Sequence, residues 1–200
     1  MKRLDIVRPA AVLGLAAAFA GTAVAEPVTY EIDSAHTYPS FEADHMGGLS
    51  KWRGKINSTT GKITLDKEAQ TGTVEVTMDM NTVDFGHEGL NNHAKSDAAM
   101  FNVSEYPTAT YTGRLVDWRD GAPTAVDGTL TLHGTSKPVR LTINSFKCMQ
   151  HPQRGVEVCG ADAEADINRA DFGMNFGQNF GFDMGVKLRI QVEALAQPSS

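Results

Sequence analysis

One segment near the end of the chain constrains the fold most strongly. Residues 186–194, VKLRIQVEA, alternate apolar and polar side chains without a break. Only a β-strand with one apolar face and one polar face has this period of two. The pattern recurs at residues 74–80, 139–143 and 161–167. We expect sheets whose apolar faces meet in the interior. In the last strand the inward residues are then Val186, Leu188, Ile190 and Val192.

The first 25 residues have the pattern of a cleavable export signal. A basic start with Lys2 and Arg3 is followed by a short apolar run at residues 10–20 and by Ala23-Val24-Ala25, which fits an A-x-A cleavage site. The apolar run is too short to cross a bilayer as a helix. We therefore expect residues 1–25 to be removed and residues 26–200 to form one periplasmic domain with a substantial core.

The charge balance argues against two classes of partner. Removal of residues 1–25 takes away three basic residues and one acidic residue, so 18 basic and 24 acidic side chains become 15 and 23, a net charge of −8. Nucleic acids and anionic lipid surfaces are bound through basic patches. We expect no nucleic-acid partner and no stable membrane insertion.

Both cysteines, Cys148 and Cys159, lie in the expected mature chain. In an oxidising compartment such a pair usually forms a disulfide. Each cysteine lies near the end of a predicted strand, with the turn residues 151–155 between them, so a bridge would hold one hairpin together. A redox-active pair is the alternative, but the spacing is not C-x-x-C.

Strand patterns separated by turn residues fill most of the chain. The predicted strands cover residues 28–33, 38–45, 52–57, 61–66, 73–81, 108–118, 126–133, 139–147, 156–167 and 183–194. Residues 84–101 instead place Leu90, Ala94 and Ala98 at helical spacing, with Asp84 as the N-cap. This order predicts an all-β, eight-stranded antiparallel up-and-down barrel with one short capping helix. A two-sheet sandwich is the alternative.

Small and flexible apolar residues suggest space inside this barrel. An eight-stranded barrel is either just filled by its side chains or holds one small ligand. Ala161, Ala163 and Ala165 share one face of a predicted strand, where larger residues would fill the interior. Met78, Met80 and Met184 would suit an adaptable apolar pocket. Close packing of the alanines against the helix would explain the same pattern.

Four motifs, in order, resemble one family over essentially the whole mature chain. They are YEIDSAH at 30–36 followed by Phe41 and HMG at 45–47, MFNVSEYP at 100–107, LTLHGTSKPVRLTI at 130–143, and INRADFGM at 167–174. Together they resemble the YceI-like, polyisoprenoid-binding family of bacterial periplasmic proteins. Thr37, the pair Tyr38-Pro39 and the cysteine hairpin depart from the usual family pattern.

The resemblance implies an elongated, lipocalin-like barrel that holds a long apolar molecule. We therefore expect a soluble periplasmic carrier of an isoprenoid, an isoprenoid quinone or a similar lipid, with no cofactor. A lipid-embedded outer-membrane barrel would instead turn its apolar face outward. The sequence leaves open whether the chain forms a homodimer.

Histidines are the candidates for polar or chemical roles. His45 shares the parity of Phe41, so it should point to the apolar side, and His36 lies beside the turn that precedes it. Both could bond a ligand head group, or they could be structural, His36 through Asp33. A lipid-modifying enzyme with one of them as the base is the alternative function. We expect His133 to face solvent, and no spacing predicts a metal site.

The segment 171–185 repeats phenylalanine followed by glycine. Glycine allows backbone freedom and the rings supply apolar contact. Phe176 and Phe180 are predicted to form a flap over the ligand entrance. Phe172 belongs to the motif that starts the turn and is predicted to pack in the core, where it could also contact the ligand.

Overall fold

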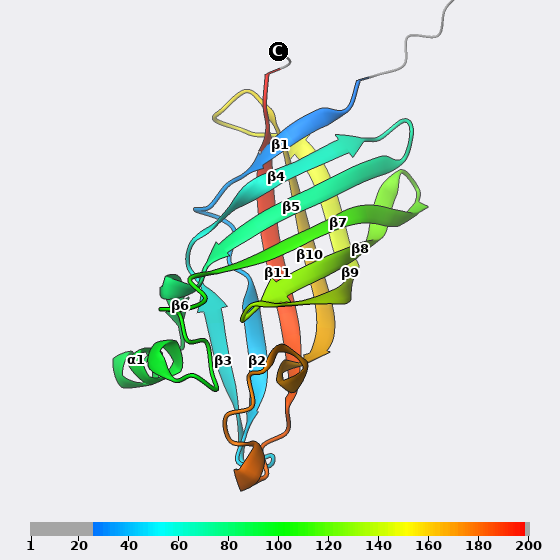
Figure 1. Cartoon of the computed structure of the whole chain (residues 1–200). Helices are drawn as coiled ribbons and strands as arrows, with labels where there is room; N and C mark the ends of the chain where they lie inside the picture. The colour runs from blue at the N-terminus through cyan, green and yellow to red at the C-terminus, as the bar shows by residue number, and fades with distance from the viewer. Residues whose placement is uncertain (1–25, 199–200) are drawn as a thin grey trace, which may run out of the picture.

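One antiparallel sheet closes into a barrel in which β1, β4, β5 and β7 to β11 follow one another, while β2, β3 and β6 extend the sheet beyond β11 (Figure 1). The computed structural model describes residues 26–198, so the predicted export signal lies outside the described residues. The strands are β1 Val28–Ile32, β2 Ser40–His45, β3 Ser50–Ile56, β4 Thr59–Asp66, β5 Thr71–Asp79, β6 Val83–Asp84, β7 Thr108–Arg119, β8 Ala122–Leu132, β9 Thr135–Gln150, β10 Glu157–Asn168 and β11 Gly185–Ala196. The helices are α1 Glu88–Ser96 and the short 3₁₀ turns η1 Met80–Thr82, η2 Arg169–Phe172 and η3 Gln178–Phe180.

Eight antiparallel strands close the upper part of the barrel. Each of β1, β4, β5, β7, β8, β9, β10 and β11 pairs with the next, and β11 pairs back with β1. The predicted eight-stranded antiparallel barrel is confirmed. The topology is up-and-down apart from two insertions. β2 and β3 lie between β1 and β4 in the chain, and η1, β6 and α1 lie between β5 and β7. Closure leaves no free edge in this part of the sheet.

The lower part of the barrel is built by an extension of the same sheet. The upper end of β11 pairs with β1, from Ile32↔Ala194, and its lower end pairs with β2, from Ser40↔Arg189. β2 then pairs with β3, and β3 with β6. The chain between β1 and β2 leaves the sheet, and Tyr38 and Pro39 lie outside β2 although the predicted strand began at residue 38. There Thr37 is buried, and its Oγ1 accepts a hydrogen bond from the backbone N–H of Glu193 at 3.1 Å.

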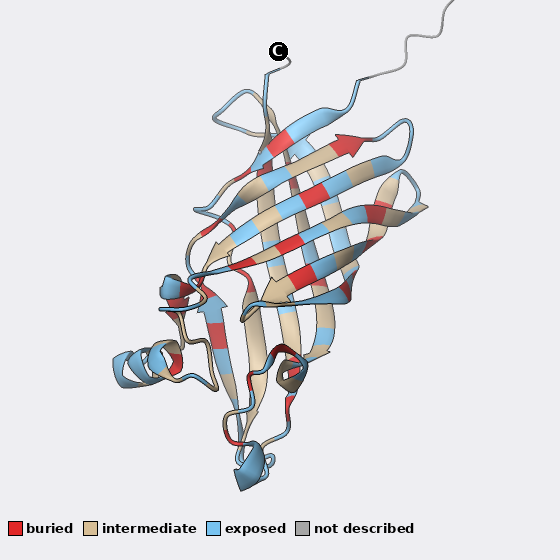
Figure 2. Cartoon of the chain, in the orientation of Figure 1, coloured by how far each residue is buried: buried red, intermediate tan, exposed pale blue. Residues whose placement is uncertain are grey.

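The apolar faces of the strands point into the barrel. Val186, Leu188, Ile190 and Val192 all border the internal cavity, so the predicted inward face of β11 is confirmed. Figure 2 shows buried and exposed positions alternating along the strands. This arrangement is the reverse of the one that a lipid-embedded barrel requires. No helix in the described residues is long and apolar enough to cross a membrane.

Two gaps in the lower wall are filled by segments outside the sheet. β9 and β10 are paired only as far as Thr142↔Glu164, and below this point η2 contacts β9 and buries Phe172 in the main core. Between β6 and β7, α1 and the loop after it bring Phe101 against a second core cluster. Pro138 lies inside β9, although the predicted strand began at residue 139. The unpaired edge of β9 explains its position, because an edge tolerates a missing N–H.

The helix is shorter than predicted and begins later. Asp84 belongs to β6, where it pairs with Lys55, so it cannot cap the helix. The predicted Asp84 cap is therefore wrong. His87 is the N-cap instead, and its Nδ1 accepts a hydrogen bond from the N–H of Leu90 at 3.2 Å. The predicted apolar face is present in part, since Ala94 is completely buried.

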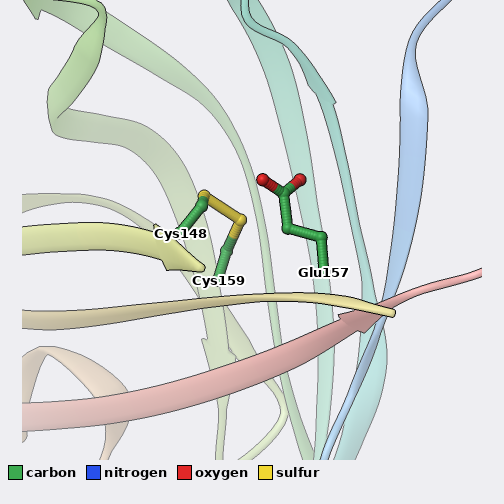
Figure 3. Close-up of side chains that lie close together, drawn as sticks. All are labelled: Cys148, Glu157 and Cys159. Carbon is green, nitrogen blue, oxygen red and sulfur yellow. A yellow bond between two sulfur atoms is a disulfide. The ribbon is translucent and has the colours of Figure 1, made fainter. Parts of the chain in front are cut away.

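The upper end of the barrel is closed by packed side chains and by the predicted disulfide. Tyr30, Leu65 and Ala194 are almost fully buried there. Cys148 on β9 and Cys159 on β10 are directly opposite one another and form the disulfide (Figure 3). The close-up shows the carboxylate of Glu157 beside the bridge, and its three ligand-type atoms lie within 4.8 Å of one another. Because the two sulfur atoms are bonded to each other, this group offers no thiolate to a metal.

Candidate functional site: an apolar cavity inside the barrel

The barrel encloses a cavity of about 240 Å³ that is partly open to solvent. Every strand of the closed barrel contributes lining residues, and nearly all of them are apolar. Along β11 the lining runs from Val186 to Val192, a length of about 20 Å at the rise of a strand. The packed layer with Tyr30 and Leu65 bounds the cavity above. A long, narrow and apolar space suits an extended apolar ligand.

Five of the residues predicted to contact a ligand line this cavity. Phe41 comes from β2, Met78 from β5, Met80 from η1 and Ala163 from β10, while Phe176 lies in the segment between η2 and η3. These side chains come from distant parts of the chain and meet only because the barrel closes. The strand that carries Ala163 also contributes Ala161, so small side chains do border open space.

The other predicted contacts lie outside the lining. Ala165 is partly buried against the main core, and Phe172 and Met184 are buried. Phe180 is strongly exposed at the lower tip. His36 is exposed and bonds the carboxylate of Asp33 at 3.0 Å. This carboxylate raises the pKa of His36, so the imidazole is engaged with a surface partner.

His45 lies beside the lower end of the cavity without lining it. Its ring stacks on Trp52 with the centroids 4.2 Å apart and meets Phe182 edge-on at 5.3 Å. Both of those aromatic side chains do line the cavity. An enzyme with His36 or His45 as the base would need the imidazole in contact with the cavity, and neither side chain has this position.

Aromatic rings form much of the lower wall. Phe85 is central: its ring lies 5.5 Å from Phe41, 6.3 Å from Trp52 and 6.4 Å from Phe101. All four rings line the cavity. Tilted and edge-on pairs at these distances are favourable contacts between aromatic side chains. The lower half of the cavity can therefore accept a flat ring as well as an aliphatic chain.

Two charged residues, Asp44 and Arg169, stand among the lining residues in the described part of the chain. Arg169 donates hydrogen bonds to the carbonyl oxygens of Met174 at 2.9 Å and Phe176 at 2.6 Å. Burial lowers the pKa of the Arg169 guanidinium, while Asp44 and Asp183 oppose this shift. The guanidinium thus shapes the segment that carries Phe176 and leaves further N–H donors beside the cavity.

Sequence reasoning missed several lining residues and misplaced one histidine. Trp52 and Ile56 are an even number of residues apart in one strand and so share a face, and this pattern could have predicted that Trp52 points inward. Phe85 and Phe101 flank the helix, where no strand period applies. His133 is half-buried rather than solvent-facing. It has a φ of 51° in the β8–β9 turn, and its Nδ1 lies 3.1 Å from the carbonyl oxygen of Phe172.

An eight-stranded up-and-down barrel around an apolar cavity is the architecture of small-ligand-binding barrels. The YceI-like domain model matches residues 30–194, and the chain belongs to this family. A UPF0312 protein of Pectobacterium carotovorum is 33% identical over 181 residues, which cover 90% of this chain and 92% of that protein.

Solved structures share the fold. BcnA of Burkholderia cenocepacia has a TM-score of 0.63 at 18% identity, covering 82% of this chain and 99% of that one. A polyisoprenoid binding domain from Saccharophagus degradans has a TM-score of 0.57 at 17% identity, covering 84% of this chain and 98% of that one. At this level of identity the likeness concerns the fold.

Proposed function

We propose that this protein is an exported, periplasmic carrier that holds an isoprenoid, an isoprenoid quinone or a similar long apolar lipid inside its barrel. The observation that carries this proposal is the cavity itself, which is long, lined almost wholly by apolar side chains and closed above. Membership of the YceI-like family and the fold shared with a polyisoprenoid binding domain support the same ligand class.

The distribution of side chains suggests how such a ligand would lie. Aliphatic residues such as Ile143, Val192 and Leu115 line the upper part, whereas the rings around Phe85 and the guanidinium of Arg169 are in the lower part. An aliphatic tail would fill the upper part, because its burial there removes apolar surface from water. A ring or polar head would lie below, against the aromatic wall.

Mass spectrometry of an organic extract from the purified protein tests the proposal. We expect one apolar lipid per protein chain in the extract. A matched pair of variants on β10 locates it: Ala163→Phe fills the cavity, and Asp166→Phe adds the same ring on the outer face. Ala163→Phe should lose the lipid, whereas Asp166→Phe should retain it. An extract without stoichiometric lipid, or equal retention by both variants, would contradict the proposal.

A further inference from the structure

Large apolar side chains are exposed at the lower tip of the molecule. Met46 and Leu49, in the β2–β3 turn, are 55% and 72% exposed, and Phe180 in η3 is 79% exposed. Among the described residues, the other large apolar side chains that are exposed, Val28 and Met149, lie in the strand ends near the upper end. Figure 1 shows η3 next to the β2–β3 turn at the lowest point of the barrel.

The two loops that carry these side chains are fixed to one another. The carboxylate of Asp44 accepts hydrogen bonds from the backbone N–H groups of Gly47 at 2.9 Å, Gly48 at 2.7 Å and Asp183 at 3.0 Å. A Cβ atom at Gly47 would lie 3.1 Å from the carbonyl oxygen of Gly181, so the backbones are in close approach. The tip is therefore an ordered surface and its apolar side chains are held outward.

Met46 has a backbone conformation that methionine rarely adopts. Its φ is 54°, and Gly47 and Gly48 follow with φ values of 65° and 95°. Asparagine or glycine would occupy the left-handed region at a lower cost. Met46 is thus both exposed and held in an unfavourable backbone conformation, and the local structure of the turn does not explain why this position has a methionine. Strain of this kind points to a role for the side chain.

The loop that carries Phe180 and the strands β2 and β3 beside the other loop border the lower end of the cavity. Asp44, Trp52 and Phe182 line it, and Phe182 is two residues from the exposed Phe180. Two aromatic side chains of the cavity lining, Trp52 and Phe182, therefore lie within three residues of the exposed tip side chains Leu49 and Phe180. A lipid that leaves the cavity at this end would meet Met46, Leu49 and Phe180 before it met open water.

We propose that Met46, Leu49 and Phe180 form a membrane-docking tip, which inserts into the surface of a lipid bilayer so that the lower end of the cavity faces the membrane. This inference rests on the proposed function, since a carrier must exchange an apolar lipid with a bilayer. Apolar side chains inserted at the boundary between head groups and acyl chains anchor proteins to membrane surfaces. After removal of residues 1–25 the 15 basic and 23 acidic side chains give a net charge of −8 and no general attraction to anionic lipids, so apolar contact provides the binding.

A bilayer fits the tip better than a protein partner does. Stable protein interfaces involve about 20–30 residues on each side. The tip offers three large apolar side chains on two short loops. Insertion into a fluid surface needs no complementary pocket, and three side chains are enough for weak, reversible binding.

Co-sedimentation with phosphatidylcholine vesicles tests the docking tip. The tip variant combines Met46→Asn, Leu49→Ser and Phe180→Ser. Asparagine favours the left-handed conformation at position 46, so the variant should keep its fold, and thermal unfolding checks this. The control Met149→Ser removes an exposed methionine, 49% exposed, from the other end. We expect the vesicle partition coefficient of the tip variant to fall about tenfold or more, and that of the control to stay unchanged.

The outcomes separate this inference from the proposed function. Equal vesicle binding by the wild-type protein and the tip variant, or no binding by either, would overturn the docking tip. Tip-dependent dimers in light scattering without vesicle binding would overturn it too, because the tip would then be a protein contact. Extraction of the same preparations reports lipid content separately. If the extract contains lipid but vesicle binding does not depend on the tip, the carrier function is supported and the docking tip is not. If the protein binds vesicles through the tip but the extract contains no lipid, only the docking tip is supported.

Discussion

The carboxylate of Asp44 accepts a hydrogen bond from the backbone N–H of Asp183 at 3.0 Å and so joins two loops that are 139 residues apart in the chain. Both loops lie beside the lower end of the cavity. We expect Asp44→Ala to release them, because three backbone N–H groups lose their acceptor. Hydrogen exchange should become faster at residues 46–49 and 177–183. Asp44→Asn keeps a side-chain oxygen as acceptor and should show a smaller effect. Unchanged exchange in Asp44→Ala would show that other contacts hold the loops.

The same carboxylate predicts a pH dependence for the tip. Hydrogen bonds from Asp183, Gly48 and Gly47 lower the pKa of Asp44, although partial burial opposes them. A carboxyl group whose pKa is lower in the folded state stabilises that state above its unfolded pKa of about 3.9. The contribution is lost as the pH falls through the folded pKa. In NMR spectra the amide signals of Gly47 and Gly48 should titrate with a midpoint below about 3.9. The Asp44→Asn variant should not show this titration.

Loss of the disulfide should weaken the closed end of the barrel. The bridge joins residues 11 positions apart, and in the chain-entropy model a loop of this size contributes about 3 kcal/mol. We expect Cys148→Ser with Cys159→Ser to lower the free energy of unfolding by about this amount in urea titrations. Wild-type protein under reducing conditions is the matched comparison and should behave like the variant. If the double variant is destabilised but the reduced wild-type protein is not, the loss of stability comes from the serine side chains and not from the missing disulfide.

Two glycines in strands should respond to alanine in opposite ways. A Cβ atom at Gly128 would lie 2.4 Å from the ring of Tyr111, whose hydroxyl donates to the carbonyl oxygen of Val139 at 2.8 Å. Gly128→Ala therefore displaces a buried ring and should destabilise the fold by about 2 kcal/mol. At Gly160 the nearest atoms would be 3.6 Å away, so Gly160→Ala should be neutral or slightly stabilising. Similar melting temperatures for the two variants would contradict this explanation.

Arg169 should control the segment that carries Phe176. Two separate N–H groups of its guanidinium donate to the carbonyl oxygens of Met174 and Phe176. A lysine has one ammonium group and cannot reproduce this planar fork of donors. We expect Arg169→Lys to cost about 2 kcal/mol of stability and to speed hydrogen exchange over residues 174–182. The lipid content of the extract should fall as well. Normal exchange with reduced lipid would instead indicate direct contact between Arg169 and the ligand.

Local patterns identified most of the barrel because each strand shows its two faces in its own sequence. The alternation in β11 predicted that every second residue from Val186 to Val192 points inward, and the cysteine spacing predicted a disulfide across one hairpin. The pattern of β9 was less informative beyond Ile143. Asn144 is an extra residue there, because Asp162 pairs with Ser145 and Ala163 pairs with Ile143. This bulge turns Phe146 inward although it is three residues from Ile143, and strict alternation cannot predict it.

Only part of the candidate site could be predicted from the sequence, because strand alternation applies only to residues inside regular strands. Phe41 and Ala163 follow strand parity, and this parity placed them inside. Phe85 and Phe101 lie beyond the ends of the helix, so their direction depends on how that segment fills the gap between β6 and β7. His133 has a left-handed backbone conformation in the tight β8–β9 turn, and this conformation sets the direction of its side chain. The imidazole contacts the carbonyl oxygen of Phe172, 39 residues away in the chain.

The sequence by itself determined the antiparallel strands, the apolar interior and the disulfide, because side-chain period, turn residues and cysteine spacing act over a few residues. Only the tertiary structure decided where that interior stays open. Packing of Tyr30 and Leu65 closes one end, while the other end depends on contacts between loops such as those of Asp44 and Asp183. These contacts join segments that are far apart in the chain, and no local pattern records them.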